Sequence, residues 1–374
     1  MDKNILKYMN ECGQSPWIDN ITRHMIMSGK LDNFISSGIT GLTSNPTIFE
    51  KAIISDDSYN ADILANIKKS MVPAKIYEAV VFEDIKNAAD KFLTIYKKTN
   101  GYDGYVSVEV SPDIAYDVSA TLKAAKEVCE KVNRPNVMIK VPATPEGINA
   151  IVELIGDGIN VNATLIFSKR QYVDAANAYI KGLQKLKKNK GDVAGVFSVA
   201  SVFVSRIDAT IDEKLNELIK QNPKQNNAAK ALIGNIAVAN SKAIYQEFKN
   251  IFFTDNFSDL TNKGAKIQKV LWASTSTKNP EYSDIKYVSE LIGANTINTL
   301  PEVTVQAFID HGTVMPTLEQ DFFLYQRYLK SLDDLGISID KVCNDLQKNG
   351  VEAFVESYRK ATTAIQKKSS VLIK

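Results

Sequence analysis

Residues 136–151 read NVMIKVPATPEGINAI, an apolar run followed by the start signals of a helix. Pro142 should end the run as a strand, because proline has no backbone N–H to donate to a neighbouring strand. Thr144 followed by Pro145 is typical of a helix N-cap and first helical position. The stretch therefore predicts a strand–loop–helix unit, with Lys140 close to the carboxyl end of the strand.

The same kind of unit recurs along the chain, where short apolar runs alternate with amphipathic segments. This alternation predicts βαβ units and a parallel sheet. The strand candidates lie near residues 16–19, 38–45, 105–110, 136–141, 159–167, 194–203, 268–275 and 295–300. Eight such strands favour a closed (β/α)₈ barrel of the TIM type over an open doubly wound sheet. The missing GxGxxG after the first strand weakens the dinucleotide-binding alternative further.

Three segments exceed a minimal barrel. We expect a short helical piece within residues 55–75 and one or two long helices over residues 208–263, interrupted near KQNPKQNN (220–227). Residues 316–374 should form a helical C-terminal extension that packs on the barrel. Because no internal repeat or low-complexity linker divides the chain, we expect residues 1–374 to form a single domain.

The composition excludes several classes of protein. Lys+Arg total 45 against 43 Asp+Glu, which gives no reason to expect a nucleic-acid or anionic-membrane partner. Three cysteines without a CxxC pair fit the reducing cytoplasm. No run of 18 apolar residues and no apolar signal core occur, so we expect no membrane segment. The two histidines, His24 and His311, are too far apart for an HExxH motif and too few for a three-histidine site, and we expect no metal.

Several predicted strands are polar on one face, whereas buried parallel strands are normally apolar on both. In YVSVEVS (105–111), Ser107, Glu109 and Ser111 share one face. The same alternation places these further polar residues on one face of their strands: Asp19, Thr43, Asn45, Asn160, Asn162, Thr164, Ser274 and Ser276. Because helices cover the outside of a barrel, this polar face should point inward. It therefore predicts a site at the carboxyl ends of the strands.

Lys140 should point inward with this polar face, and two interpretations are open. Its stem can line the strand while the amine reaches solvent. Alternatively, burial favours the neutral form of an amine, which can attack a carbonyl and form a Schiff base. Glu109, one strand earlier, is either its acid–base partner or one half of a structural ion pair.

The motifs that contain these residues resemble the transaldolase family, in its longer bacterial subfamily. They run from residue 15 to 302 and read SPWIDNITR, GITGLTSNPTIFEKAI, VSVEVSP, VMIKVPATPEGINAI, GINVNATLIFS, SVASVFVSRID, LWASTSTKNPEYSD and NTLPE. The C-terminal extension matches no motif. The resemblance implies a metal-free, cofactor-free barrel enzyme of the pentose phosphate pathway. Such an enzyme transfers a dihydroxyacetone unit from sedoheptulose 7-phosphate or fructose 6-phosphate to glyceraldehyde 3-phosphate or erythrose 4-phosphate.

The resemblance also implies roles for individual residues. Lys140 would form the Schiff base, Glu109 would act as acid and base through a water, and Asp19 would take the proton of the C4 hydroxyl. The substrate-binding positions would be Asn45 and Asn162 for hydroxyls, Thr164 for the water, Ser201 and Phe203 for the pocket wall, and Arg206 for phosphate. Shorter members carry an arginine after strand seven. Here Ser276 stands near that place, Ser274 remains, and Lys278 would supply the charge.

Alternatives remain for residues and for function. Asp19 could cap the next helix, Asn45 before Pro46 could only start a turn, and Arg206 could pair with Asp208 at the surface. The chain could be a related class I aldolase that acts on fructose 6-phosphate or free dihydroxyacetone. It could also be a non-catalytic sugar-phosphate-binding barrel. The sequence leaves open a monomer or a homodimer, the preferred donor and acceptor, and the second phosphate ligand.

Overall fold

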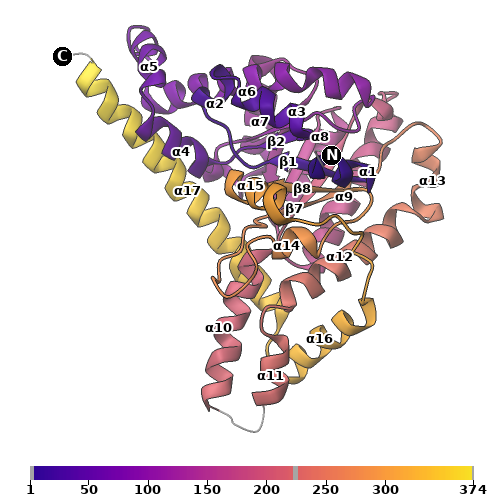
Figure 1. The fold of residues 1–374 in the computed structure, drawn as a ribbon. Helices are drawn as coiled ribbons and strands as arrows, with labels where there is room; N and C mark the ends of the chain where they lie inside the picture. The colour runs from indigo at the N-terminus through magenta and orange to yellow at the C-terminus, as the bar shows by residue number, and fades with distance from the viewer. Residues whose placement is uncertain (1–3, 222–225, 373–374) are drawn as a thin grey trace.

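The computed structural model describes residues 4–221 and 226–372, in which eight parallel strands close into a barrel in chain order. The strands are β1 (Gln14–Ile18), β2 (Gly41–Thr43), β3 (Val106–Glu109), β4 (Val137–Pro142), β5 (Val161–Ile166), β6 (Ser198–Phe203), β7 (Lys269–Ala273) and β8 (Thr296–Leu300). Each predicted strand overlaps one of them, although β1 begins two residues before the predicted 16–19 and β4 extends one residue beyond the predicted 136–141 to include Pro142. The (β/α)₈ barrel is therefore confirmed, with helices around it (Figure 1).

The helices of the first half follow the strands as the local signals predict. They are α1 (Ile5–Glu11), α2 (Arg23–Met27), α3 (Lys30–Ser37), α4 (Pro46–Ser55), α5 (Asn60–Ile67), α6 (Pro73–Lys98), α7 (Val118–Val132), α8 (Pro145–Gly156) and α9 (Lys169–Lys188), with 3₁₀ turns η1 (Asp57–Tyr59), η2 (Pro112–Ile114) and η3 (Val193–Gly195). Thr144 caps α8 by accepting from the Gly147 amide, and Pro145 occupies the first position. The helical piece expected within 55–75 is α5.

The second half contains more helices than predicted between residues 208 and 263. It comprises α10 (Ser205–Gln221), α11 (Asn226–Leu232), α12 (Ile236–Phe252), α13 (Asp255–Thr261), α14 (Lys286–Ser289) and α15 (Glu302–His311). One break falls at Gly234, which adopts a φ of +71° and donates its amide to the Asp212 carboxylate. The expected interruption includes residues 222–225, which lie outside the described residues.

The C-terminal extension is helical, as predicted. It consists of α16 (Phe322–Asp334) and α17 (Ile339–Leu372), and residues 373–374 lie outside the described residues. Figure 1 shows α17, in yellow, as one long helix that passes α10 and α4. It also contacts α5, α6 and β5. The extension thus contacts the barrel itself. That residues 1–374 form a single domain stays a prediction.

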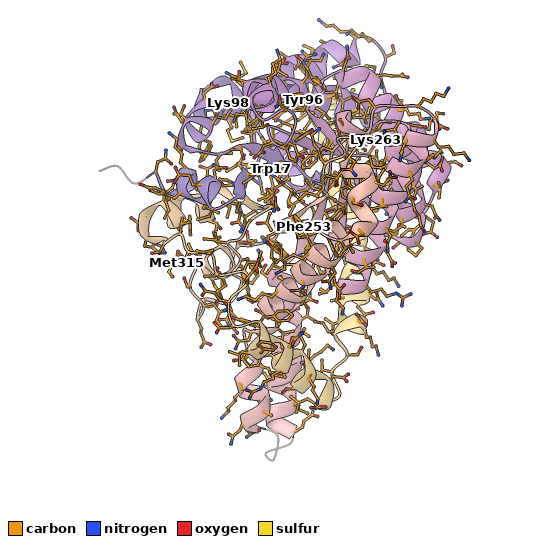
Figure 2. The ribbon with its side chains drawn as sticks, turned by 90° about the vertical axis from the view of Figure 1, so that its right-hand side faces the viewer. Trp17, Tyr96, Lys98, Phe253, Lys263 and Met315 are labelled. Atoms are coloured by element: carbon orange, nitrogen blue, oxygen red, sulfur yellow. The ribbon has the colours of Figure 1, made fainter. Side chains whose placement is uncertain are left out.

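The barrel interior is polar at both ends. At the amino ends of the strands, Gln14 donates to the Thr296 hydroxyl (2.9 Å) and Gln268 to the Ser198 hydroxyl (2.9 Å). The amide nitrogens of the two glutamines are thus paired with hydroxyls, while their side-chain oxygens are buried without a hydrogen-bond partner within the described residues. The Trp17 ring is fully buried among the packed side chains (Figure 2), and Gly41 leaves room for it, because a Cβ there would lie 2.4 Å from the ring.

None of the helices in the described part of the chain combines the length and the apolar character that a membrane span requires.

Candidate active site

A cavity of about 300 Å³ opens at the carboxyl ends of the strands, within the size range of small-molecule sites. Most of the predicted site residues line it: Asp19, Asn45, Lys140, Thr164, Ser201, Phe203, Arg206, Ser274, Ser276 and Lys278. Glu109 and Asn162 lie next to the lining, in contact with Lys140 and Ser201 respectively. The inward polar face predicted from the strands therefore converges on one place.

Lys140 lies on β4 with its amine inside the barrel. Its side chain is 6% exposed, so the interpretation in which the amine reaches bulk solvent is wrong. Nζ donates to the Ser44 carbonyl (2.9 Å) and lies 2.6 Å from Glu109 Oε1. The pairing of β3 with β4 places Glu109 directly beside Lys140, which fixes this contact. The amine thus faces the cavity with one carboxylate at hand.

Glu109 forms the ion pair that was the structural alternative, but its partner is the candidate nucleophile itself. Burial raises the pKa of Glu109, and the charge of Lys140 acts in the opposite direction. A carboxyl group whose burial favours the protonated form, in contact with an amine, can exchange a proton with it. A smaller cavity of about 70 Å³ adjoins Glu109 and is lined by residues of α6 and α7.

Asp19 follows β1 directly, and its amide donates to the Leu300 carbonyl (2.8 Å) at the end of β8. Its carboxylate accepts from the Thr43 hydroxyl (2.8 Å). The alternative role as a helix cap is wrong, because Thr22 caps α2 through the Met25 amide. Burial raises the pKa of Asp19, while Lys140 opposes that effect. Asp19 is therefore a carboxyl group with a raised pKa in the same cavity as the amine, where it can exchange a proton with a ligand.

Asn162 lies under the cavity and not in its wall. It is fully buried, donates to the Ser107 hydroxyl (3.1 Å) and accepts from the Ser201 hydroxyl (2.6 Å). These bonds occupy both ends of its amide. The Thr164 hydroxyl, in contrast, is buried and has no hydrogen-bond partner within the described residues. Such an atom needs a water or a ligand, which agrees with the water-orienting role implied for Thr164.

Asn45 caps a helix and also lies in the cavity wall. Its side-chain oxygen accepts from the Ile48 amide (3.0 Å) and caps α4, with Pro46 at the first helical position. The same residue lines the cavity. The cap fixes the orientation of the amide group within the cavity wall.

Three cations gather at one end of the cavity. Arg206, in the first turn of α10, forms no ion pair with any described residue, and burial lowers its pKa. Lys278 Nζ donates to the Ser276 hydroxyl (3.0 Å). Burial lowers the pKa of Lys278, the charges of Arg206 and Lys51 lower it further, and the charge of Asp19 acts in the opposite direction. A cluster of cations at one end of a cavity, none of them in an ion pair within the described residues, is typical of an anion site.

Two predictions about this end of the cavity need correction. Arg206 does not pair with Asp208, because Asp208 is buried and accepts from the Ala237 amide and the Tyr287 hydroxyl. Ser274 and Ser276 do not belong to a strand face, because β7 ends at Ala273 and Ser274 adopts a φ of +55°. Both serines reach the cavity from the loop, where the Ser274 hydroxyl lies 3.0 Å from that of Ser205.

Sequence reasoning missed two notable residues of the wall. Lys51 lies on α4, where the cap at Asn45 starts the helix and positions 47, 48 and 51 share the face toward the cavity. That spacing was a usable signal. Phe354 comes from α17, and its ring centre lies 6.0 Å from Lys140 Nζ. No motif covers α17, so only the fold shows this contact.

The described residues contain no group of three or more His, Cys, Asp or Glu side chains arranged to hold a metal ion.

Comparison with known proteins identifies the relatives of this chain. The family model for transaldolase/fructose-6-phosphate aldolase matches residues 16–365. A transaldolase of Trichodesmium erythraeum is 44% identical over 373 residues, which cover 98% of each chain. Transaldolase 2 of Nostoc punctiforme is 41% identical over 100% of this chain and 99% of its own. A transaldolase of Neisseria meningitidis serogroup C is 38% identical over 95% and 98%.

Proposed function

The chain belongs to the transaldolase/fructose-6-phosphate aldolase family and acts as a transaldolase, and we propose that its active site is the cavity around Lys140. One observation carries this proposal. A buried amine faces the cavity at the carboxyl end of β4, with the Asp19 carboxyl group in the cavity wall after β1 and the Glu109 carboxyl group beside the amine on β3. These are the groups that Schiff-base chemistry on a ketose requires.

The first half-reaction begins at the C2 carbonyl of the ketose phosphate. Glu109 accepts a proton from Lys140, and the neutral amine adds to C2. The resulting carbinolamine loses its hydroxyl as water when Glu109 returns the proton, which leaves an iminium ion on Lys140. The two side chains lie 2.6 Å apart, and we propose that the water held by Thr164 carries this proton between Glu109 and the reacting atoms.

Asp19 then removes the proton of the C4 hydroxyl. The electrons of that O–H bond form the carbonyl of the departing aldehyde, and the electrons of the C3–C4 bond move toward the iminium nitrogen. A three-carbon enamine remains on Lys140. The acceptor aldehyde is attacked by this enamine, Asp19 returns the proton, and hydrolysis with the help of Glu109 releases the new ketose.

The cationic end of the cavity suits the phosphate group of donor and acceptor. We propose Arg206 as one phosphate ligand and Lys278 as the second, positioned by its bond to Ser276. Lys51 adds a third charge at the same end. Asn45 and Ser274 would bind substrate hydroxyls, Thr164 would hold the water, and Ser201 and Phe203 would form the wall. Asn162 accepts a hydrogen bond from Ser201 and would contribute by holding that side chain in place. Alternatively, it would exchange this hydrogen bond for one to a substrate hydroxyl.

A coupled assay tests the function. Fructose 6-phosphate with erythrose 4-phosphate should give sedoheptulose 7-phosphate and glyceraldehyde 3-phosphate, and omission of the acceptor should stop turnover. Borohydride should trap a three-carbon adduct at Lys140, located by peptide mass spectrometry. Steady release of dihydroxyacetone without acceptor would favour the related aldolase. Binding without any adduct would favour the non-catalytic barrel.

Further proposals concern the setting of the enzyme. We propose a cytoplasmic enzyme with sugar-phosphate substrates, one domain over residues 1–374, no nucleic-acid or membrane partner, and a monomeric or homodimeric state.

We also propose that catalysis needs no metal, because the site relies on an amine and two carboxyl groups. Prolonged incubation with a chelator should leave the rate unchanged, and restoration of a lost rate by a divalent ion would contradict the mechanism.

A further inference from the structure

We infer that Phe354, on the C-terminal helix α17, is a specificity-determining residue that shields the Lys140 adduct from water and so directs the three-carbon enamine to the acceptor. The inference rests on the proposed function. Between the two half-reactions the enamine waits on Lys140. Protonation at C3 gives an iminium ion, addition of water gives a carbinolamine, and loss of the amine releases free dihydroxyacetone. A transferase must keep this route slow.

Phe354 occupies the right place to do so. Its ring centre lies 6.0 Å from Lys140 Nζ, it is 6% exposed, and it lines the cavity. Much of the lining near the amine consists instead of carboxyl, hydroxyl and amide groups. An aromatic ring offers water at most a weak hydrogen bond. A ring packed beside the reacting carbons therefore keeps water away from them. Its face also tolerates the positive charge of an iminium ion.

The helix that carries Phe354 is anchored on both sides of it. Gln347, two turns before Phe354, donates to the carbonyls of Ala143 (3.0 Å) and Leu165 (2.9 Å). The Leu165 carbonyl is free to accept, because Leu165 adopts a φ of +56° where the pairing of β5 with β6 shifts register. Ser357, one turn after Phe354, shares a hydrogen bond of 2.8 Å with Thr47 on α4.

The anchors and the ring lie on one face of α17. Residues 347, 350, 354 and 357 follow helical spacing, so they point to the same side. Gly350 completes the fit, because a Cβ at this position would lie 2.9 Å from Leu165 Cδ2. A bulged strand, a glutamine and a glycine thus seat the helix at a defined height above Lys140. The position of the ring is therefore determined by the barrel and not by the extension alone.

The test compares two fates of the same enamine. With fructose 6-phosphate as donor and erythrose 4-phosphate as acceptor, the measured quantity is the ratio of free dihydroxyacetone to transferred units. We expect Phe354→Ser to raise this ratio about tenfold, which corresponds to about 1.4 kcal/mol between two competing barriers. Phe354→Leu and Phe354→Val should raise it in that order, as the volume removed increases.

Val355→Ser is the matched control. Val355 is the next residue of the same helix and packs against the core, but it does not line the cavity. This change should leave the ratio unaltered. An equal rise in both serine variants would mean that loosening of α17 is responsible, and would overturn the assignment to Phe354.

Two more outcomes complete the test. An unchanged ratio in a folded Phe354→Ser protein that still forms the adduct would overturn the inference. If Phe354→Ser does not fold, the leucine and valine variants decide the question. Ratios in both variants equal to that of the unaltered enzyme would likewise overturn the inference. Failure of the unaltered enzyme to form any adduct at Lys140 would instead contradict the proposed function, so the two failures are distinguishable.

Discussion

Two buried ion pairs in this molecule look alike but differ in what surrounds them. Arg23 Nε lies 2.9 Å from Asp84, and Lys140 Nζ lies 2.6 Å from Glu109. Arg23 also contacts Asp62, the Ser58 carbonyl and the ring of Tyr59. Lys140 has the Ser44 carbonyl and otherwise faces a cavity.

The difference teaches how burial can serve structure or chemistry. Burial alone would lower the pKa of Arg23, but Asp84 and Asp62 raise it above the usual value, so this charge is permanent. A guanidinium group does not deprotonate in proteins, whereas an ammonium group can. Burial raises the pKa of Glu109 even with Lys140 beside it. The first pair ties two helices and a turn together, and the second is placed to exchange a proton.

The largest effect should come from making the second pair resemble the first. Lys140→Arg keeps a cation beside Glu109 but removes the amine that can form an imine. We expect loss of turnover by more than about 10⁴-fold, the scale seen when a nucleophile is removed. No borohydride adduct should form, while the melting temperature stays near that of the unaltered enzyme. An adduct on another lysine would show that the nucleophile has been misassigned.

Asp19→Asn separates the steps within the open site. Carbinolamine formation depends on Lys140 and Glu109, whereas cleavage of C3–C4 needs a base on the C4 hydroxyl. We expect kcat to fall by about 10²–10⁴, the usual contribution of a positioned base. Borohydride should then trap the intact six-carbon sugar on Lys140. Cleavage at a near-normal rate would assign the C4 proton to another group.

Arg23→Met tests the pair assigned to structure. Removal of one partner leaves Asp84 buried without its cation, which typically reduces the free energy of unfolding by about 3–5 kcal/mol. Chemical denaturation measures this loss. The kcat of the folded fraction should change little. Arg134→Met is the control, because its pair with Asp90 is exposed and should contribute at most about 1 kcal/mol. A large fall in kcat for Arg23→Met would show that the pair also serves catalysis.

Arg206→Ala extends the comparison to a buried cation without a carboxylate partner. We expect KM for phosphorylated donor and acceptor to rise about 10–100-fold, in line with about 1.5–3 kcal/mol for a hydrogen bond to a charged group. The kcat should change less, because the phosphate lies beyond the reacting carbons. Steady-state kinetics with both substrates measures the two parameters. Unchanged KM values would remove Arg206 from the site.

The sequence predicts the barrel because its signals are local. Alternating polarity, the proline at the end of β4 and the cap at Thr144 each act within a few residues. The side chains of Lys140 and Glu109 both point into the barrel. They lie together because the register between β3 and β4 pairs the two residues directly. The departures have physical causes. Ser274 leaves its strand through a left-handed residue, and the polar amide of Asn162 is satisfied by two serines.

Long-range contacts mark the limit of that reasoning. Phe354 reaches Lys140 only because α17 is seated on a bulge in β5, and no local pattern encodes where a distant helix will rest. The division of residues 208–263 into α10–α13 likewise depends on a turn at Gly234 that Asp212 holds from another helix. Lys51 is an intermediate case, because its face follows from a helix start that the sequence does show.

The smallest expected effect concerns stability and pH, and it again separates the two kinds of buried charge. Burial raises the pKa of Asp19 above its value in the unfolded chain. A carboxyl group with a raised pKa stabilises the folded state fully below its unfolded pKa, and this contribution is lost as pH rises through the folded pKa. Asp19→Asn has the same shape and no charge. It should therefore match the unaltered enzyme near pH 4 and exceed it in stability at pH 7–8 by about 1 kcal/mol, the usual size of a single substitution. Denaturation at both pH values measures the gap, and Arg23→Met should lose stability at both. If Asp19→Asn were the less stable protein at pH 7–8, the Asp19 charge would be held by Lys140 as firmly as Asp84 holds Arg23, and the distinction between the two pairs would fail.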